Sequence, residues 1–342
     1  MIDVNTHHRS PGNQAATAGP IHALTIDVED YHNVIARDWL GRDGPPTEAV
    51  VRNTERLLQH FADHGVRATM FVLGEVAETF PELVRRMAGA GHEIGVHGYY
   101  HRQVFKLTPE SFRAEVEPAR KRLQDLTGQP VLGHRAPAFS IMPATQWALE
   151  VLTEVGFEYD SSIFPIRGRR YGWPGFRFDI HRLTLPSGRT IIEAPLSTVT
   201  VLGRAMPVCG GGYLRHFPAA VTRWAMRRVG AVRPAILYTH PYEIELPLPP
   251  LDTRHLAPAA ARRARLFHWL QRRNRQTVER KIVALLKQFS FAPLGEVIHR
   301  VLGSDEVGAL VAPGASCDNS ATNPAGSAPA RSVAHPVAER VP

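Results

Sequence analysis

Residues 91–101 read G-H-E-I-G-V-H-G-Y-Y-H. Gly91 stops a helical pattern that begins near Phe80, and the apolar residues after it predict a short strand that ends at His97. His97 and His101 are four residues apart just past this glycine-rich strand end. If the chain turns back after the strand, two imidazoles at this spacing can bind one divalent cation. The segment therefore predicts a strand end that carries metal ligands.

The same alternation of strand and helix extends to both sides of this segment. Before it lie an apolar strand at 21–27, a helix from Thr47 to Gly65 and a strand at 66–73. After it lie a helix from Thr108 to Gly128, a strand at 130–135, a helix from Pro143 to Gly156 and a strand at 159–161. Repeated units of this kind predict an α/β fold with a parallel sheet that is closed or nearly closed.

The second half of the chain is less regular. Residues 165–212 are rich in Gly, Pro and Arg but contain strand-like apolar residues, so we expect a long insertion within the fold. The alternation returns with a helix at 218–230, a strand at 235–240 and two basic helices within 254–289. Residues 1–20 and 304–342 lack the apolar content to offset ordering entropy and are expected to be disordered. One catalytic domain at 21–303 is the simplest organisation.

Reactive side chains follow four of the predicted strands. In chain order they are Asp27, Glu29 and Asp30, then His97 and His101, then Arg135, and last His240. In parallel α/β folds the catalytic groups come from the carboxyl ends of the strands, so we expect these side chains on one rim. Carboxylates with two histidines and a separate histidine indicate a hydrolytic metal site.

Six motifs occur in a distinctive order. They are D-V-E-D-Y at 27–31, H-x-x-x-H at 97–101, R-x-P at 135–137, D-S-S-I-F-P at 160–165, G-G-G-Y-L-R at 210–215 and H-P-Y-E-I at 240–244. Over roughly residues 22–300 the chain resembles the polysaccharide deacetylases of carbohydrate esterase family 4, the NodB-homology group. The closer resemblance is to the subgroup associated with exosortase (PEP-CTERM) systems and exopolysaccharide biosynthesis.

This resemblance implies a distorted, TIM-like, incomplete (β/α) barrel of about seven parallel strands. It also implies hydrolysis of the N-acetyl group of an N-acetylhexosamine within a polysaccharide or its lipid-linked precursor. The N-acetylated glycan would be the substrate, and contacts with exopolysaccharide assembly machinery or an anionic membrane are further expected partners. The residues themselves indicate only a site suited to amide or ester hydrolysis, so a deacylase of a non-carbohydrate amide is an alternative.

The resemblance implies that one carboxylate and two histidines hold the metal, and we assign His97 and His101 to it. The acidic ligand comes from the first motif, which departs from the family's usual pair of adjacent aspartates. Strand alternation places Asp27 and Glu29 on the same side, which favours Glu29 as the ligand. Asp30 remains the alternative if the strand has already ended. Zn²⁺ is the favoured metal, with Co²⁺ or another first-row divalent ion as alternatives.

Amide hydrolysis also needs a base and an acid. We predict that Asp27 is the base and that Arg135 holds its carboxylate ionised and oriented. His240, at the end of the last predicted strand, is the acid that protonates the departing amine.

The formal net charge of +8 favours anionic partners. The densely basic segment at 262–275 also carries Leu266, Phe267, Trp269 and Leu270, a pattern compatible with an anionic membrane or nucleic acid. A solvated outer helix with an apolar stripe facing the core is the preferred interpretation, and no nucleic-acid motif supports the alternative of a binding module. The N-terminus shows no apolar signal region, so a cytoplasmic location is expected.

Overall fold

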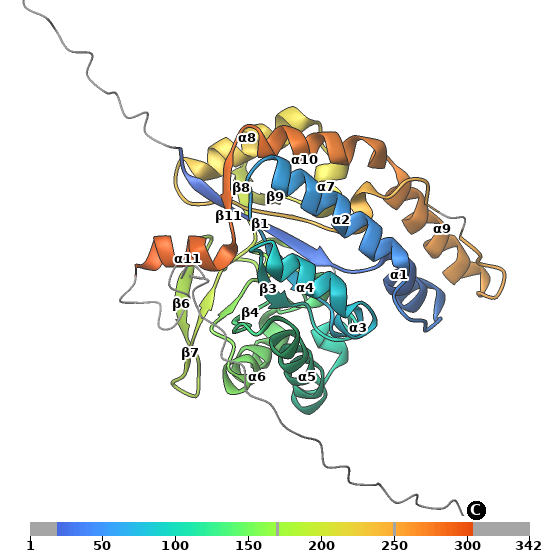
Figure 1. Cartoon of the computed structure of the whole chain (residues 1–342), viewed down its shortest axis with the longest axis horizontal. Helices are drawn as coiled ribbons and strands as arrows, with labels where there is room; N and C mark the ends of the chain where they lie inside the picture. Colours follow the sequence, from blue (N-terminus) through green and yellow to red (C-terminus); the bar gives the residue numbers. More distant parts are fainter. Residues whose placement is uncertain (1–18, 169–170, 249–250, 304–342) are drawn as a thin grey trace, which may run out of the picture. The chain divides into compact units, whose positions relative to one another are not determined.

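The structure is a computed structural model that describes residues 19–168, 171–248 and 251–303. The segments expected to be disordered, 1–20 and 304–342, therefore lie outside the described residues apart from Gly19 and Pro20. The elements alternate along most of the chain, and Figure 1 shows the helices packed around the outside of one curved sheet.

The sheet is open and mostly parallel. Its order is β10 (Ile236–Thr239), β1 (Ile21–Val28), β2 (Thr69–Val72), β3 (Glu93–Val96), β4 (Gly133–His134), β5 (Tyr159–Asp160), β7 (Thr190–Glu193) and β6 (His181–Thr184). Neighbours from β10 to β7 run parallel, whereas β6 is antiparallel to β7. A further strand, β11 (Ser290–Ala292), pairs with the start of β1. The predicted incomplete barrel with seven parallel strands is confirmed.

The helices cover the outer face of the sheet. They are α1 (Tyr31–Leu40), α2 (Glu48–Asp63), α3 (Gly74–Thr79), α4 (Pro81–Gly89), α5 (Pro109–Thr127), α6 (Trp147–Val155), α7 (Gly211–His216), α8 (Ala219–Gly230), α9 (Pro258–Arg272), α10 (Val278–Leu286) and α11 (Leu294–Leu302). Thr47 and Thr108 accept backbone hydrogen bonds at the N-termini of α2 and α5, which explains where these helices begin. Among the described residues, no helix is both long and apolar enough to cross a membrane.

Three parts of the fold were not anticipated. Helix α1 begins directly after the first acidic motif, and β11 with α11 follows the two basic helices. The segment predicted as an insertion, 165–212, contributes β7 to the parallel sheet and β6 to its edge. Only β8 (Thr198–Val201) and β9 (Arg204–Pro207) form a separate hairpin. The antiparallel edge accounts for the broken β-α rhythm, because a hairpin needs no crossover helix.

Two buried histidines fix backbone groups beside the first strands. Nδ1 of His22 accepts the N–H of Ala235 at 3.0 Å, and Nδ1 of His92 accepts the N–H of Ala68 at 3.1 Å. An acceptor nitrogen carries no proton, so both imidazoles are neutral in the folded protein. Burial lowers the pKa of each to about 4.

Candidate active site

The site lies where β1, β3, β4 and β10 end. Asp27 belongs to β1 and Glu29 follows it, and both side chains are buried. Because these four strands are parallel and are linked through neighbouring strands of the same sheet, their carboxyl ends lie on one edge of the barrel. The structure brings six of the seven predicted site residues together at this edge.

Glu29, His97 and His101 form a compact cluster. One ligand atom from each lies within 4.8 Å of those of the other two, and all three residues are buried. Oε2 of Glu29 is 2.7 Å from Nε2 of His101 and 3.7 Å from Nε2 of His97. The chain turns back after β3 as the spacing requires, and His101 adopts a positive φ of 57°. A non-glycine residue in this conformation is uncommon and is typical of functional sites.

The donor set fits a divalent cation. Oε2 of Glu29 is buried and has no hydrogen-bond partner of good geometry, although it faces two imidazole nitrogens. Nδ1 of His97 is 2.9 Å from the backbone carbonyl of Arg135. Since a carbonyl only accepts, Nδ1 carries the proton and the lone pair of Nε2 points toward Glu29. One carboxylate and two imidazoles are ligands that Zn²⁺ takes readily.

Charges within this cluster shift its ionisation. Burial alone would raise the pKa of Glu29, but His101, His97 and His240 outweigh it and hold that pKa well below its usual range. Burial would lower the pKa of His101, yet Glu29 and Asp38 raise it to about 10. Asp38, on α1, places Oδ2 3.7 Å from Nδ1 of His101. Sequence reasoning did not find Asp38, because it predicted no helix there.

Asp30 lies outside the cluster. Its Oδ1 accepts the N–H of His32 at 3.2 Å as the N-cap of α1, and its Oδ2 accepts the N–H of Thr47 at 2.6 Å. Burial raises the pKa of Asp30. The alternative in which Asp30 supplies the acidic ligand is not supported by this geometry, because both oxygens are taken by backbone groups at two helix starts.

Arg135 holds Asp27 in place. Its Nη1 donates to Oδ1 of Asp27 at 2.8 Å and to Oγ1 of Thr25 at 2.7 Å, and its Nε donates to the carbonyl of Ser161 at 3.0 Å. Nη2 donates to Oγ of Ser161 at 2.9 Å, and the guanidinium lies 4.4 Å from the ring centre of Phe71. Arg135 is fully buried. The guanidinium is therefore fixed from both sides, and it fixes the carboxylate in turn.

His240 faces the two carboxylates from the end of the neighbouring strand, β10. Its Nε2 is 3.8 Å from Oδ2 of Asp27 and 3.6 Å from Oε1 of Glu29. Its Nδ1 is 3.6 Å from Oε1 of Glu243, and its ring stacks on Tyr242 at 4.7 Å between centres. Burial alone would lower the pKa of His240, but the carboxylates around it raise that pKa.

Arg215 and Glu243 complete this side of the site. Nη1 of Arg215 donates to Oε2 of Glu243 at 2.5 Å, and both side chains are buried. Burial would raise the pKa of Glu243, but Arg215 and His240 hold it at about 2. Both residues belong to motifs noted in the sequence, yet sequence reasoning gave them no role. The one indication of this contact in the sequence was a glutamate three residues after His240.

Two glycines allow Arg215 to reach Glu243. A Cβ on Gly210 would lie 2.2 Å from the carbonyl oxygen of Tyr238 in β10, and a Cβ on Gly211 would lie 2.7 Å from its ring. Gly210 also forms a bridge with Tyr238. The start of α7 can therefore pack directly against β10, which brings Arg215 beside the turn that follows this strand.

An open α/β barrel with carboxylates and imidazoles at its rim is typical of metal-dependent hydrolases. Comparison with known families gives a more specific class. Residues 42–159 match the family described as polysaccharide deacetylase, and residues 161–299 match a domain of unknown function (DUF3473). Residues 42–159 are thus similar to polysaccharide deacetylases, and this match includes His97, His101 and Arg135. His240, Glu243 and Arg215 lie in the second match.

Curated relatives share part of this sequence, and a solved structure shares the fold. The chain is 36% identical over 109 residues to a peptidoglycan-N-acetylglucosamine deacetylase of Bacillus cereus, covering 32% of this chain and 38% of that protein. It is 34% identical over 108 residues to a peptidoglycan deacetylase of Helicobacter pylori, covering 32% of this chain and 36% of that one. The chain thus spans less than two fifths of the length of these relatives.

The crystal structure of a "putative polysaccharide deacetylase from Mycobacterium smegmatis" shares the fold. The two align with a TM-score of 0.54 and 21% identity over 83% of this chain and 91% of that one.

Proposed function

We propose that this chain is a metal-dependent hydrolase that removes N-acetyl groups from an N-acetylhexosamine-containing polysaccharide or its precursor, in exopolysaccharide biosynthesis. The observation that carries the proposal is the buried Glu29–His97–His101 cluster, with Asp27 and His240 beside it. The relatives named as deacetylases of peptidoglycan support an N-acetylated glycan as the substrate. The motif order in the second half of the chain supports the exopolysaccharide role.

Glu29, His97 and His101 would hold the cation, with Zn²⁺ favoured and Co²⁺ or another first-row ion as the alternative. When bound, the cation supplies a Lewis acid that polarises the amide carbonyl at the end of the barrel. The protein's own contribution is to arrange proton donors and acceptors around the acetamide.

Asp27 is the base in this proposal. Its Oδ1 is occupied by Arg135, whereas its Oδ2 faces His240 and is free to accept a proton from the attacking water. A guanidinium bound to one carboxylate oxygen keeps the group oriented while the other oxygen accepts the proton.

His240 is the acid. The surrounding carboxylates raise its pKa, so the imidazole is protonated more readily than in water and can donate from Nε2 to the leaving amine. Glu243 lies against the other ring nitrogen and orients the ring, and Arg215 keeps Glu243 ionised. Tyr242 stacks on the ring and limits its rotation.

Acetate release tests this function. The full chain, loaded with Zn²⁺ or Co²⁺, is incubated with a panel of N-acetylated oligosaccharides, and released acetate is measured before and after chelation. We expect release from at least one glycan, its loss on chelation and its return when metal is added back. Release that survives chelation would show that the cluster does not serve a metal-dependent reaction, and no release from any glycan would refute deacetylation.

A matched histidine variant serves as the control. His255 is exposed, and it hydrogen-bonds the carbonyl of Leu40 at 3.0 Å, which lies outside the Glu29–His97–His101 cluster. His255→Ala should keep both metal and acetate release, whereas His97→Ala should lose both. Loss of activity in both variants would point to general damage.

A further inference from the structure

Helix α9 buries small or polar side chains and exposes large apolar ones, which is unusual for a helix whose only role is to cover a barrel. Its buried residues are Ala261, Ala264 and His268, which are small or polar. Its large apolar residues point outward, with Leu266 59% exposed, Trp269 52% and Leu270 38%. The expected apolar stripe facing the core is therefore wrong for this helix, since only Phe267 packs inward, against Trp39 at 4.0 Å. Contiguous exposed apolar residues of this kind mark interaction sites.

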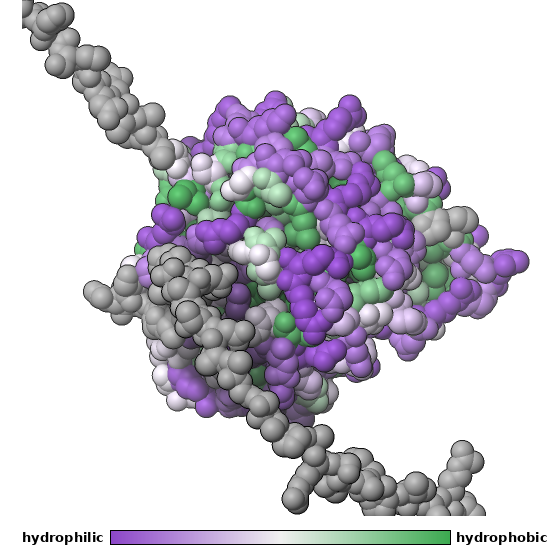
Figure 2. All heavy atoms as spheres, in the orientation of Figure 1, coloured by the Kyte–Doolittle hydropathy of each residue, from purple (hydrophilic) through white to green (hydrophobic). Residues whose placement is uncertain are grey.

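Arginines surround this apolar ridge. Arg262 and Arg263 lie exposed one turn before it, Arg265 beside it, and Arg272 and Arg273 at its far end. Between residues 253 and 278 the sequence has seven arginines and no acidic residue. In Figure 2 the flank formed by α9 shows green patches set among purple ones. The face therefore combines positive charge with apolar bulk, and its ends are more strongly charged than its middle.

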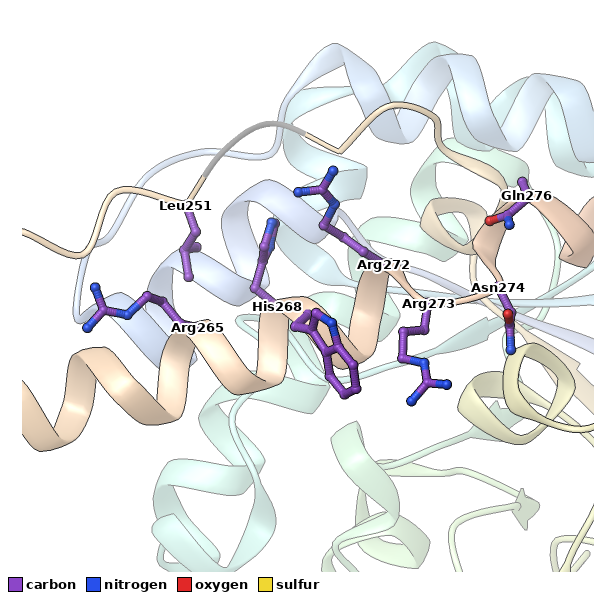
Figure 3. A pocket seen from close by; sticks show the side chains of 8 residues that line it. Leu251, Arg265, His268, Arg272, Arg273, Asn274 and Gln276 are labelled. Atoms are coloured by element: carbon purple, nitrogen blue, oxygen red, sulfur yellow. The ribbon is translucent and has the colours of Figure 1, made fainter.

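A pocket opens beside the ridge. It has a volume of about 520 Å³, and its lining residues are Leu251, Arg265, His268, Trp269, Arg272, Arg273, Asn274 and Gln276. Figure 3 shows Leu251 on the facing loop, with His268 and Arg272 pointing from α9 toward it. The guanidinium of Arg273 lies 4.7 Å from the ring centre of Trp269. The pocket offers guanidinium and amide donors at its mouth, as an anionic headgroup requires.

We propose that α9 docks this protein on an anionic phospholipid bilayer, with Leu266, Trp269 and Leu270 entering the interface and the arginines binding lipid phosphates. An interfacial helix has this composition, with tryptophan and leucine on the face that enters the lipid and arginine around it. Nucleic acid would be served by the arginines but gives no reason for two exposed leucines beside a tryptophan.

The buried side of α9 is linked to the candidate active site by a short chain of contacts. His268 of α9 lies with Nδ1 2.8 Å from the hydroxyl of Tyr31, which follows the acidic motif directly. Tyr31 packs on Tyr242 at 5.6 Å, and Tyr242 stacks on His240. A bilayer on the exposed face of α9 would therefore be separated from the candidate active site by this helix and these side chains. If the proposed deacetylation is right, a glycan held on a lipid carrier is the substrate that this arrangement suits.

Vesicle flotation tests the docking. The full chain is mixed with vesicles of phosphatidylcholine alone or of phosphatidylcholine with phosphatidylglycerol. We expect binding only to the anionic vesicles, with weaker binding at high salt. Arg265→Ala with Arg273→Ala should weaken binding about 25-fold, at about fivefold for each arginine. Leu266→Ser with Trp269→Ser should weaken it by at least about tenfold, because their apolar surface no longer enters the lipid.

A control variant changes an exposed leucine and an exposed arginine on a different element, the β8–β9 hairpin. Leu202 is 97% exposed in the turn between β8 and β9, and Arg204 is exposed beside it. Leu202→Ser with Arg204→Ala should bind vesicles as the unaltered protein does. Melting temperatures of all variants exclude loss of fold as the cause of weaker binding.

Absent binding to anionic vesicles would overturn the docking proposal, and so would binding that the α9 variants leave unchanged. Binding to a DNA oligonucleotide that is lost in the α9 variants, without vesicle binding, would assign the face to nucleic acid instead. Acetate release from a soluble oligosaccharide, measured on the same proteins, separates the two proposals. Vesicle binding without acetate release leaves the docking intact and refutes the deacetylation, whereas the reverse refutes the docking alone.

Discussion

Replacing Arg135 with methionine removes the counter-ion of Asp27 from the interior of the barrel. Arg135 is fully buried and Asp27 almost so, and they are joined by a hydrogen bond of 2.8 Å. Methionine retains an apolar stem that can pack against Phe71, over which the guanidinium lies. The change therefore removes charge and donors while largely preserving the volume.

The magnitude follows from what is left behind. Removing one partner of a buried pair costs about 3–5 kcal/mol, because the other charge stays buried without compensation. Thr25 and the carbonyl of Ser161 each lose a donor as well, so we expect Arg135→Met to lower the free energy of unfolding by about 4 kcal/mol. When Asp27 is changed to Asn in the same protein as Arg135→Met, neither buried charge of the pair remains. The double variant should therefore cost less than the two single changes added together, by about 2 kcal/mol.

Urea unfolding at neutral pH measures this interaction in the unaltered protein, Arg135→Met, Asp27→Asn and the double variant. Acetate release is followed in the same four proteins. Arg113→Met is the control, because Arg113 pairs with Glu154 at the surface and should cost no more than about 1 kcal/mol. If Arg135→Met costs as little as the control, or if the single changes add within about 0.5 kcal/mol, Arg135 and Asp27 are not a compensated buried pair. Acetate release that survives in Arg135→Met would show that Asp27 needs no guanidinium to act.

Three further predictions concern histidines. His97→Ala and His101→Ala should each lose bound metal and keep the fold, and metal analysis that finds full stoichiometry in either variant removes that residue from the ligand set. His240→Ala should slow hydrolysis of an acetamide more than that of an activated ester, whose leaving group needs little protonation; equal losses would mean that His240 positions the substrate instead.

Because burial lowers the pKa of His22 and His92 to about 4, the unfolded chain binds more protons between about pH 6.5 and pH 4. As the pH falls through that window, the free energy of unfolding should decrease by on the order of 1 kcal/mol per histidine for each pH unit. A flat urea midpoint from pH 7 to pH 5 would contradict it.

Regular periodicity made much of the fold predictable. Helices α2, α4, α5, α6 and α8 and the parallel strands β1 to β5 and β10 lie within a few residues of their predicted positions, because their apolar residues follow a regular pattern. Helix α1 was missed because it starts at Tyr31, inside the segment that was interpreted as a catalytic motif. Strand β7 and the edge strand β6 were taken for an insertion, since the place of β7 in the sheet depends on pairing with β5, about 30 residues earlier in the chain.

The candidate site was likewise predictable only in part. That Asp27, Glu29, His97, Arg135 and His240 would meet followed from their positions after parallel strands. The contact between Glu243 and Arg215 could not be predicted, because it requires β10 to lie beside β1 and α7 to pack against β10. The hydrogen bonds of Asp30 to backbone groups at two helix starts likewise could not be predicted, because no local pattern reveals them.

The three buried carboxylates of the site have three different sets of partners, and in the proposed function these partners separate their roles. Asp27 has a guanidinium on one oxygen only, so its other oxygen can exchange a proton without losing its position. Oε2 of Glu29 faces the imidazoles of His97 and His101, which fits its proposed role as a metal ligand.

Arg215 and His240 hold the pKa of Glu243 at about 2, so Glu243 is anionic at neutral pH and lies against Nδ1 of His240. An anion against Nδ1 stabilises the doubly protonated imidazolium, which also carries a proton on Nε2, and in the proposed function this is the state that the acid needs.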